Sequence, residues 1–329
     1  MEHIFEQRKQ HTDQRINEFR LSLDAFLGDD RDKVVGDHTC IYATGSAGRG
    51  ELGAHSDLDV FLLRSSGSSK KLDEVILQSA VVRAMRSCQF PDPSNDGEFL
   101  KLHTVEEFKQ QMGGRGDDWF NTFTARTLLL LESTPVLGDV AYQKAIDGVL
   151  EAYWKNSEMH PRDYLPIVLV NDIVRYWRIV LLNYESKNVH SKDKPEADRW
   201  LRSYKLRFSR CLTCYSALAH LLFLSREPQK HVERNEVYGM VLLSPRGRLE
   251  EISKKSGVLT IRDRVSSLLD LYSLFLNTTG EEKESLLEQF SNEEFRRARF
   301  DEANQFGQSM FELIQCLGAS SPLYRFVVV

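Results

Sequence analysis

The stretch from residue 41 to residue 63 constrains the fold more than any other part of this 329-residue chain. An apolar strand enters a turn at Gly45-Ser46, a glycine-rich segment follows, and a second strand opens with Asp57-Leu58-Asp59. Because side chains alternate between the two faces of a strand, Asp57 and Asp59 are expected to point the same way. Two neighbouring carboxylates repel each other unless a cation neutralises them, and paired oxygen ligands suit Mg²⁺. The stretch therefore predicts a divalent-metal site at the start of a strand.

The glycines of the same stretch predict close contact with an anion. Gly45 and the glycines after it carry no Cβ atom, so backbone N–H groups can approach a phosphate closely. One cation, Arg49, and one anion, Glu51, lie in the same segment. We interpret the stretch as a phosphate-binding loop beside a divalent-metal site. The alternative is a surface loop followed by an ordinary edge strand.

Gly45-Ser46, ten intervening residues and Asp57-x-Asp59 together resemble the signature of the polymerase-β-type nucleotidyltransferase superfamily. The fuller run, Gly-Ser-x-Gly-Arg-Gly-Glu ending in Ser-Asp-Leu-Asp, is similar to the branch that contains the PII-protein uridylyltransferases and the glutamine-synthetase adenylyltransferases. The resemblance implies Mg²⁺, or Mn²⁺, as cofactor and a nucleoside triphosphate, ATP or UTP, as substrate. It also implies that Asp57 and Asp59 ligate the metal. The residues expected to bind the nucleotide or brace this loop are Gly45, Ser46, Arg49, Glu51 and Ser56.

A third carboxylate on a neighbouring strand completes the metal site in this superfamily, where it faces the attacking hydroxyl. The sequence offers Glu98, at the start of Glu-Phe-Leu-Lys-Leu-His, with Asp96 as its rival. The usual pattern places an Asp deeper inside this strand, so the chain departs from the family here. A solvated strand end is the alternative interpretation of Glu98.

Composition limits the other classes of function. The hydrophobic fraction of 41% and the charged fraction of 28% are typical of a soluble globular protein. Because the net charge is -5, any nucleic-acid site must be confined to a basic patch on part of the surface. The five scattered cysteines, the polar first residues and the absence of an apolar run of membrane length predict a cytoplasmic protein without signal peptide or membrane span. No recognition of a DNA sequence is expected.

Hydrophobic periodicity predicts an α+β fold, with the order strand, strand, helix, strand followed by an all-helical part. The first part suffices for the small mixed sheet that the resemblance implies. The expected domains are an N-terminal helix at 1–35, a nucleotidyltransferase domain at 36–115 and a helical domain at 116–329 that closes over the nucleotide. The boundary is placed near 112–117, where Met-Gly-Gly-Arg-Gly-Asp breaks the pattern. The helices expected in the last part span 118–132, 139–156, 163–186, 197–225, 259–277 and 291–317, and 324–329 could add a strand.

Two polar groups inside the helical part are further candidates. Asn171, Arg175 and Arg178 form one stripe of an apolar helix, so Arg175 and Arg178 could line a cleft and bind phosphate. The alternative is an exposed face with a local Asp172 ion pair.

The segment 199–210 holds five basic residues interleaved with three aromatic ones, which could contact a triphosphate or RNA. Lys205 and Arg210 are the candidates for the β- and γ-phosphates. The alternative is a solvated basic helix face. The nearby pair Cys211 and Cys214 lacks partners at zinc spacing, so both are expected to be core residues.

The predicted activity is the transfer of a nucleoside monophosphate from a nucleoside triphosphate to a hydroxyl, with release of pyrophosphate. A protein acceptor follows from the resemblance. An RNA acceptor is suggested by the basic and aromatic segment, and a small-molecule acceptor is also open. A nucleotide-sensing or interaction module without turnover is the alternative if the third acid is missing.

Overall fold

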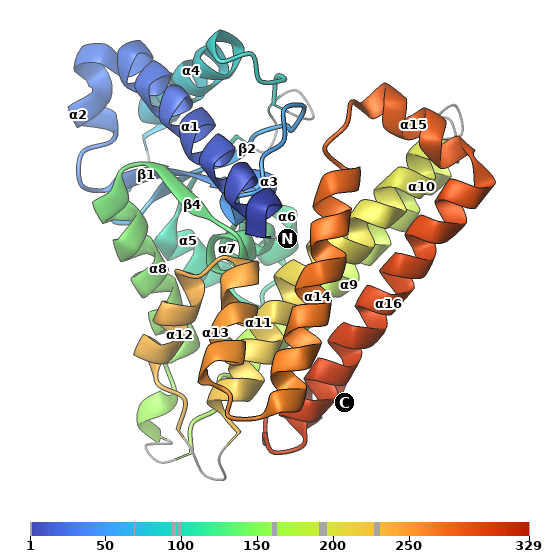
Figure 1. Ribbon diagram of the computed structural model, residues 1–329. Coiled ribbons are helices and arrows are strands. Elements are labelled where there is room, and N and C mark those ends of the chain that lie inside the picture. The colour runs from blue at the N-terminus through green and yellow to red at the C-terminus, as the bar shows by residue number, and fades with distance from the viewer. Residues whose placement is uncertain are drawn as a thin grey trace. The chain divides into compact units, whose positions relative to one another are not determined.

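The computed structural model describes residues 2–68, 70–93, 97, 100–159, 163–190, 196–226 and 231–328. Over these residues the protein is α+β, with a four-stranded sheet and many helices (Figure 1). The chain forms two compact units. The sheet unit is Phe5–Lys155, and the helical unit combines Met1–Ile4 with Asn156–Val329. We describe each unit by itself.

The sheet unit contains all four strands of this sheet. Its elements are α1 (Glu2–Leu27, from Phe5 onward), α2 (Arg31–Val34), β1 (Thr39–Thr44), α3 (Gly45–Arg49), β2 (Asp59–Arg64), α4 (Lys71–Ser87), β3 (Leu102–Thr104), α5 (Val105–Gln111), α6 (Gly116–Trp119), α7 (Thr122–Leu131), β4 (Thr134–Leu137) and α8 (Asp139–Tyr153).

The sheet is mixed, as predicted, with strand order β3-β2-β1-β4. β1 pairs antiparallel with both β2 and β4, whereas β3 runs parallel to β2. The parallel pair is joined through α4, which is the kind of helical crossover that parallel neighbours need. Thr44 lies opposite Asp59 across the β1–β2 ladder, so the end of β1 and the beginning of β2 meet at one edge of the motif.

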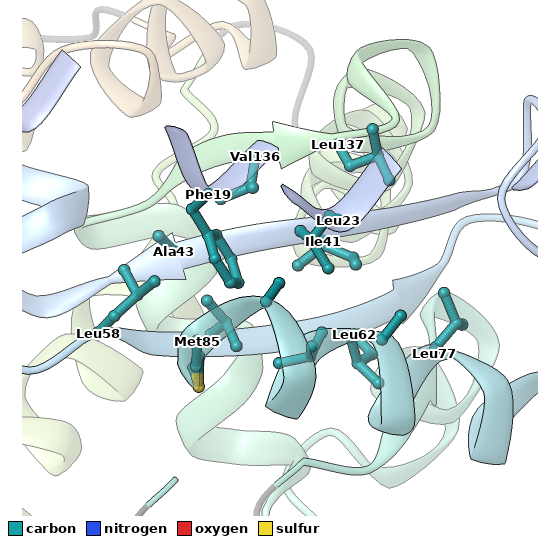
Figure 2. Close-up of a cluster of buried hydrophobic side chains, with 14 of the residues drawn as sticks. Phe19, Leu23, Ile41, Ala43, Leu58, Leu62, Leu77, Met85, Val136 and Leu137 are labelled. Atoms are coloured by element: carbon teal, nitrogen blue, oxygen red, sulfur yellow. The ribbon is translucent and has the colours of Figure 1, made fainter. Parts of the chain in front are cut away.

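One face of the sheet packs against α1 and α4. Phe19 and Leu23 of α1 are fully buried and lie over Ile41 of β1, in the same apolar cluster as Leu62 and Met85 (Figure 2). The predicted N-terminal helix is confirmed as α1, but it is part of the sheet's core rather than a separate domain at 1–35. Its apolar stripe needs a partner to be buried, and the sheet supplies it.

The opposite face packs against α5, α7 and α8. Tyr42 stacks on Phe61 across the β1–β2 pair, with ring centroids 5.4 Å apart. The Tyr42 hydroxyl donates to the carbonyl of Ala125 in α7 at 2.9 Å. The sheet is therefore covered on both faces, which explains why every residue of β1 is buried.

The spacing of Leu72, Val75, Ile76 and Ala80 predicts a helix over 71–88 with these four residues on its inner side. The helix is confirmed as α4, but the predicted inner side is partly wrong. Leu72 and Val75 are 62% and 51% exposed, whereas Leu77, Val81 and Met85 are buried. Asp73 explains the rotation, because its buried carboxylate accepts from Arg64 of β2 at 2.9 Å and fixes the first turn of the helix.

The predicted domain boundary near 112–117 is also displaced. Residues 134–137 form β4, which pairs with β1, and α8 follows it back over the sheet. The chain therefore stays in the sheet unit to Lys155, so the expected all-helical domain at 116–329 begins only at Asn156.

The helical unit consists of α9 (Ile167–His190), α10 (Glu196–Lys205), a π-helical turn (Leu206–Arg210), α11 (Cys211–Leu224), α12 (Arg234–Val241), α13 (Pro245–Lys255), α14 (Leu259–Thr278), α15 (Lys283–Ser291), α16 (Glu293–Gly318) and α17 (Tyr324–Val328). The predicted helix at 197–225 corresponds to α10, the π-helical turn and α11, which follow one another without a break. The predicted C-terminal strand is wrong, because that segment is the helix α17. In the described part of the chain, no helix has the length and apolarity to cross a membrane.

Candidate functional site

Asp57 and Asp59 lie where the motif loop becomes β2. Both carboxylates are exposed, whereas Leu58 and Val60 are only 5% and 8% exposed. The alternation therefore places the two acids on one side of the chain. Gly45 adjoins them, with φ at +64°, and a Cβ atom there would lie 3.2 Å from the Oδ2 atom of Asp59. The structure thus brings the predicted glycine and the second predicted acid together.

The expected turn at Gly45-Ser46 is the start of a five-residue helix, α3. The Ser46 carbonyl accepts from the Glu51 N–H at 2.8 Å, and Gly50 ends the helix in the left-handed conformation. The first N–H groups of a helix have no partner within it. The glycine-rich segment is therefore an ordered short helix rather than an open loop.

Arg49 is the centre of a buried ion-pair network. Its guanidinium donates to Glu51 and to Glu132, each at 2.7 Å. The three side chains are at most 7% exposed. Of the two predicted roles for Arg49 and Glu51, bracing the loop is the one these contacts support. The role of Glu132 was not predicted, because this residue follows an apolar helix. A carboxylate directly after an apolar helix is the sequence signal that could have indicated a buried ion pair.

Gly48 allows the loop to approach that network closely. A Cβ atom at Gly48 would lie 2.0 Å from the backbone oxygen of Glu132, which no side chain tolerates. The α3 segment is therefore packed directly against the chain that leads from α7 into β4.

Two residues of α1 hold the other side of the loop. The Thr12 hydroxyl accepts from the Leu52 N–H at 2.9 Å. The Arg8 guanidinium fills the space above Gly53, where a Cβ atom would lie 2.2 Å from Nη1. Burial lowers the pKa of Arg8, and the charge of Glu51 partly opposes this. Sequence reasoning missed both residues because they lie about forty positions from the loop they contact.

Ser56 closes the loop before the acids. Its hydroxyl accepts from the Gly53 N–H at 2.9 Å, and its own N–H donates to the Gly53 carbonyl at 3.2 Å. These contacts shape the loop, and the predicted contact between Ser56 and the nucleotide stays a prediction.

Removing the central cation of this network should destabilise the sheet unit. Arg49→Met leaves the buried carboxylates of Glu51 and Glu132 facing each other, so we expect a loss of about 2–3 kcal/mol in the free energy of unfolding. Urea unfolding measures this loss. Adding Glu51→Gln and Glu132→Gln should recover much of it; a triple variant that is no more stable than Arg49→Met would contradict the ion-pair account.

The predicted third acid, Glu98, and its rival Asp96 lie outside the described residues. β3 runs parallel to β2 with Leu102 opposite Leu62, so the described residues Leu100 and Lys101 precede β3 on the side of the Asp59 end of β2. Among the residues that the structure describes, no group of three His, Cys, Asp or Glu side chains could hold a metal. The third ligand therefore remains a prediction.

His103 of β3 is buried on the face opposite α1 and α4, beside the rings of Phe61 and Phe108. Among the described residues neither ring nitrogen has a hydrogen-bond partner. Burial, together with the charge of Lys101, lowers the pKa of His103 from 6.5 to about 4. The imidazole is therefore neutral in the folded protein at neutral pH.

This histidine predicts a loss of stability in mild acid. The unfolded chain takes up a proton near pH 6.5 and the folded chain only near pH 4, so stability is present above pH 6.5 and falls toward pH 4. Between pH 6.5 and 5 we expect His103 to contribute a loss of about 2 kcal/mol. Unfolding of His103→Phe should depend less on pH than unfolding of the wild type; parallel curves over this interval would refute the assignment.

Arg175 and Arg178 lie on α9 in the helical unit. Asn171 and Arg178 are exposed, and Arg175 is half-buried with an interaction of its own, so the predicted stripe follows the solvent-facing side of the helix. Lys205 is exposed at the end of α10, and Arg210 is half-buried at the end of the π turn. Their predicted contacts with phosphate remain predictions.

The basic and aromatic segment is largely engaged within the helical unit. Tyr204 and Phe208 are fully buried, and the Phe208 ring stacks on Phe275 with centroids 4.9 Å apart. Arg202 pairs with Asp198 at 3.1 Å. Because these two rings form the core, they are not available to stack on RNA bases.

Two further contacts of this segment are also internal. The Arg207 guanidinium donates to the Asn304 amide oxygen at 2.8 Å, and Arg199 pairs with Glu196 at 2.9 Å.

Cys211 and Cys214 are buried, as predicted for core residues, and burial raises the pKa of Cys211 to about 12.

Comparison of the chain with family models, curated proteins and solved structures gives no match in any of the three. The resemblance to nucleotidyltransferases therefore rests on the sequence motif.

Proposed function

We propose that the sheet unit is the catalytic domain of a metal-dependent nucleotidyltransferase. The observation that carries the proposal is the placement of Asp57 and Asp59, two exposed carboxylates on one side of the chain, next to Gly45 and the start of α3. A pair of hard oxygen ligands beside a backbone that can approach a phosphate is what a metal-bound triphosphate requires.

The residues present fit a divalent cation. Asp57 and Asp59 are both exposed, so water can reach their carboxylate oxygens. Gly45 leaves open the space beside Asp59 that a Cβ atom would fill. The loop between them is fixed by Arg49, Thr12 and Ser56, so the ligands are preorganised. Mg²⁺ or Mn²⁺ bound there would neutralise the charge of the triphosphate.

In the proposed reaction, the oxygen of an acceptor hydroxyl forms a bond to the α-phosphorus of the nucleoside triphosphate. The bond from that phosphorus to the bridging oxygen breaks, and pyrophosphate leaves with the electron pair. The hydroxyl proton passes to a base, the role predicted for Glu98. Most of the rate enhancement comes from positioning and from neutralisation of charge.

The acceptor is a protein, an RNA or a small molecule. The burial of Tyr204 and Phe208 removes two of the three rings that could have stacked on RNA, so the RNA alternative loses support. The resemblance of the motif to the regulatory uridylyl- and adenylyltransferases favours a protein acceptor. ATP and UTP remain the candidate substrates.

Calorimetric titration with ATP and with UTP, each with and without Mg²⁺, tests the site. We expect metal-dependent binding that Asp57→Asn/Asp59→Asn abolishes. The matched control is Asp29→Asn/Asp30→Asn, which removes the same charge from two exposed acids after α1 and should bind normally. Equal binding by both double variants would refute the metal site; binding without turnover would favour the sensing module.

A further inference from the structure

Two aromatic side chains are exposed where α6 ends. Trp119 is 82% exposed, the highest value among the large apolar side chains in the described part of the chain, and Phe120 is 49% exposed. We call these two residues the aromatic turn. Exposing large apolar rings to water is unfavourable, so two adjacent exposed rings indicate a ligand-binding or interaction surface.

The aromatic turn is held rigidly from beneath. Asp117 and Arg126 are fully buried and joined by two hydrogen bonds of 2.8 and 2.9 Å. Asp117 also accepts from the Thr122 hydroxyl at 2.9 Å and from the Gly113 N–H at 3.2 Å. The rings are therefore displayed by an anchored turn, which lowers the entropy cost of binding.

Lys101 connects the aromatic turn to the sheet. Its ammonium nitrogen lies 5.3 Å from the centre of the Phe120 ring, within the range of a cation–π contact. Lys101 stands one residue before β3, where Leu102 lies opposite Leu62. Continuing this register by one residue sets Lys101 beside Phe61.

The same register relates Lys101 to the acid pair. Residues two apart in a strand lie on the same face of the sheet, so Lys101 shares a face with His103, and Asp59 shares a face with Phe61. The rings of His103 and Phe61 are in contact. All four residues therefore lie on the same face. Asp59 is two residues before Phe61 on the neighbouring strand, so its backbone is about 8 Å from that of Lys101. The cation and the aromatic turn thus lie on the acid pair's side of the sheet.

We propose that Lys101 and the aromatic turn bind the nucleoside triphosphate whose phosphates lie at Asp57 and Asp59: Trp119 and Phe120 stack on its base, and Lys101 contacts a phosphate oxygen. This inference rests on the proposed function. Stacking on a ring tolerates every base, and a purine offers more area than a pyrimidine. The site therefore binds ATP more tightly than UTP.

Inorganic tripolyphosphate separates the base from the phosphates in the test. With Mg²⁺ present, Trp119→Ala should raise the Kd for ATP about 5- to 100-fold and leave the Kd for tripolyphosphate unchanged. Trp119→Phe should restore most of the ATP affinity. Lys101→Ala should weaken both ligands by a similar factor. The control is Leu72→Ala, which truncates a 62% exposed side chain on α4 and should change neither Kd.

The outcomes distinguish the two proposals. ATP binding that needs Asp57 and Asp59 but is unaffected by Trp119→Ala would overturn the base site and leave the proposed function standing. Equal weakening of ATP and tripolyphosphate by Trp119→Ala would also overturn it, since that pattern reports a general disturbance. ATP binding that needs Trp119 but not the acid pair would support the base site and overturn the transferase. A wild type that binds no nucleotide would overturn both.

Discussion

Replacing Asp57 or Asp59 with asparagine should reduce nucleotide transfer at least about a thousandfold. Metal-held charge neutralisation is worth several kcal/mol in the transition state, and each 1.36 kcal/mol corresponds to a factor of ten in rate. Both side chains are exposed, so neither carboxylate is part of the buried core. The melting temperature should therefore stay the same or rise, because two like charges are no longer adjacent.

Release of pyrophosphate and a calorimetric melting curve on the same samples measure these two effects. The Asp29→Asn/Asp30→Asn variant provides the control for a change of net charge. Collapse of the fold in both single variants would mean that the acids are structural, and the metal site would have to be abandoned.

Replacing Arg126 with methionine should remove about 3–5 kcal/mol from the free energy of unfolding, the range observed when one partner of a buried ion pair is deleted. Arg126 and Asp117 have no exposed surface. Burial alone would raise the pKa of Asp117, but the hydrogen bonds and charge of Arg126 hold it below its ordinary value. Without Arg126 this buried carboxylate keeps the neutral donors Thr122 and Gly113 but loses the guanidinium that compensates its charge.

Urea unfolding of two further variants tests whether charge is the cause. Arg126→Met/Asp117→Asn should be more stable than Arg126→Met, because the uncompensated carboxylate is gone. Arg86→Met removes a similar side chain from the exposed pair with Asp92 and should leave stability unchanged. If Arg126→Met behaves like Arg86→Met, the buried pair does not hold α6 in place.

The sequence predicted those features of the fold that are encoded locally. The helices α1 and α4 form where apolar residues recur at helical spacing, and the pattern Thr104-Val105-Glu106-Glu107, typical of a capping box, begins α5. Alternation alone placed Asp57 and Asp59 on one side, with Leu58 buried between them. Each of these features depends on residues within a few positions of one another.

Features that depend on distant partners were not predictable in the same way. β4 is four residues long and contains Pro135, so it reads as a loop until its pairing with β1 is known. That pairing moved the boundary of the sheet unit. Arg8 and Glu132 support the motif loop from 40 or more positions away, and their roles depend on buried contacts that no local pattern records.

The basic and aromatic segment shows the same limit. Its composition suggested a surface for RNA, but Tyr204 and Phe208 have the spacing of a helix whose aromatic side faces the core of the helical unit. Which rings are buried is decided by the surrounding helices, including Phe275 and Phe306 on α14 and α16.

The most direct measurement is incubation of the protein with Mg²⁺, a cell lysate and each of the four nucleoside triphosphates labelled at the α-phosphate. The account predicts that label enters a protein, RNA or small-molecule fraction with the wild type and not with Asp57→Asn/Asp59→Asn. The labelled fraction would identify the acceptor class. Label that enters equally with both proteins, or with neither, would contradict the proposal that this site transfers nucleotides.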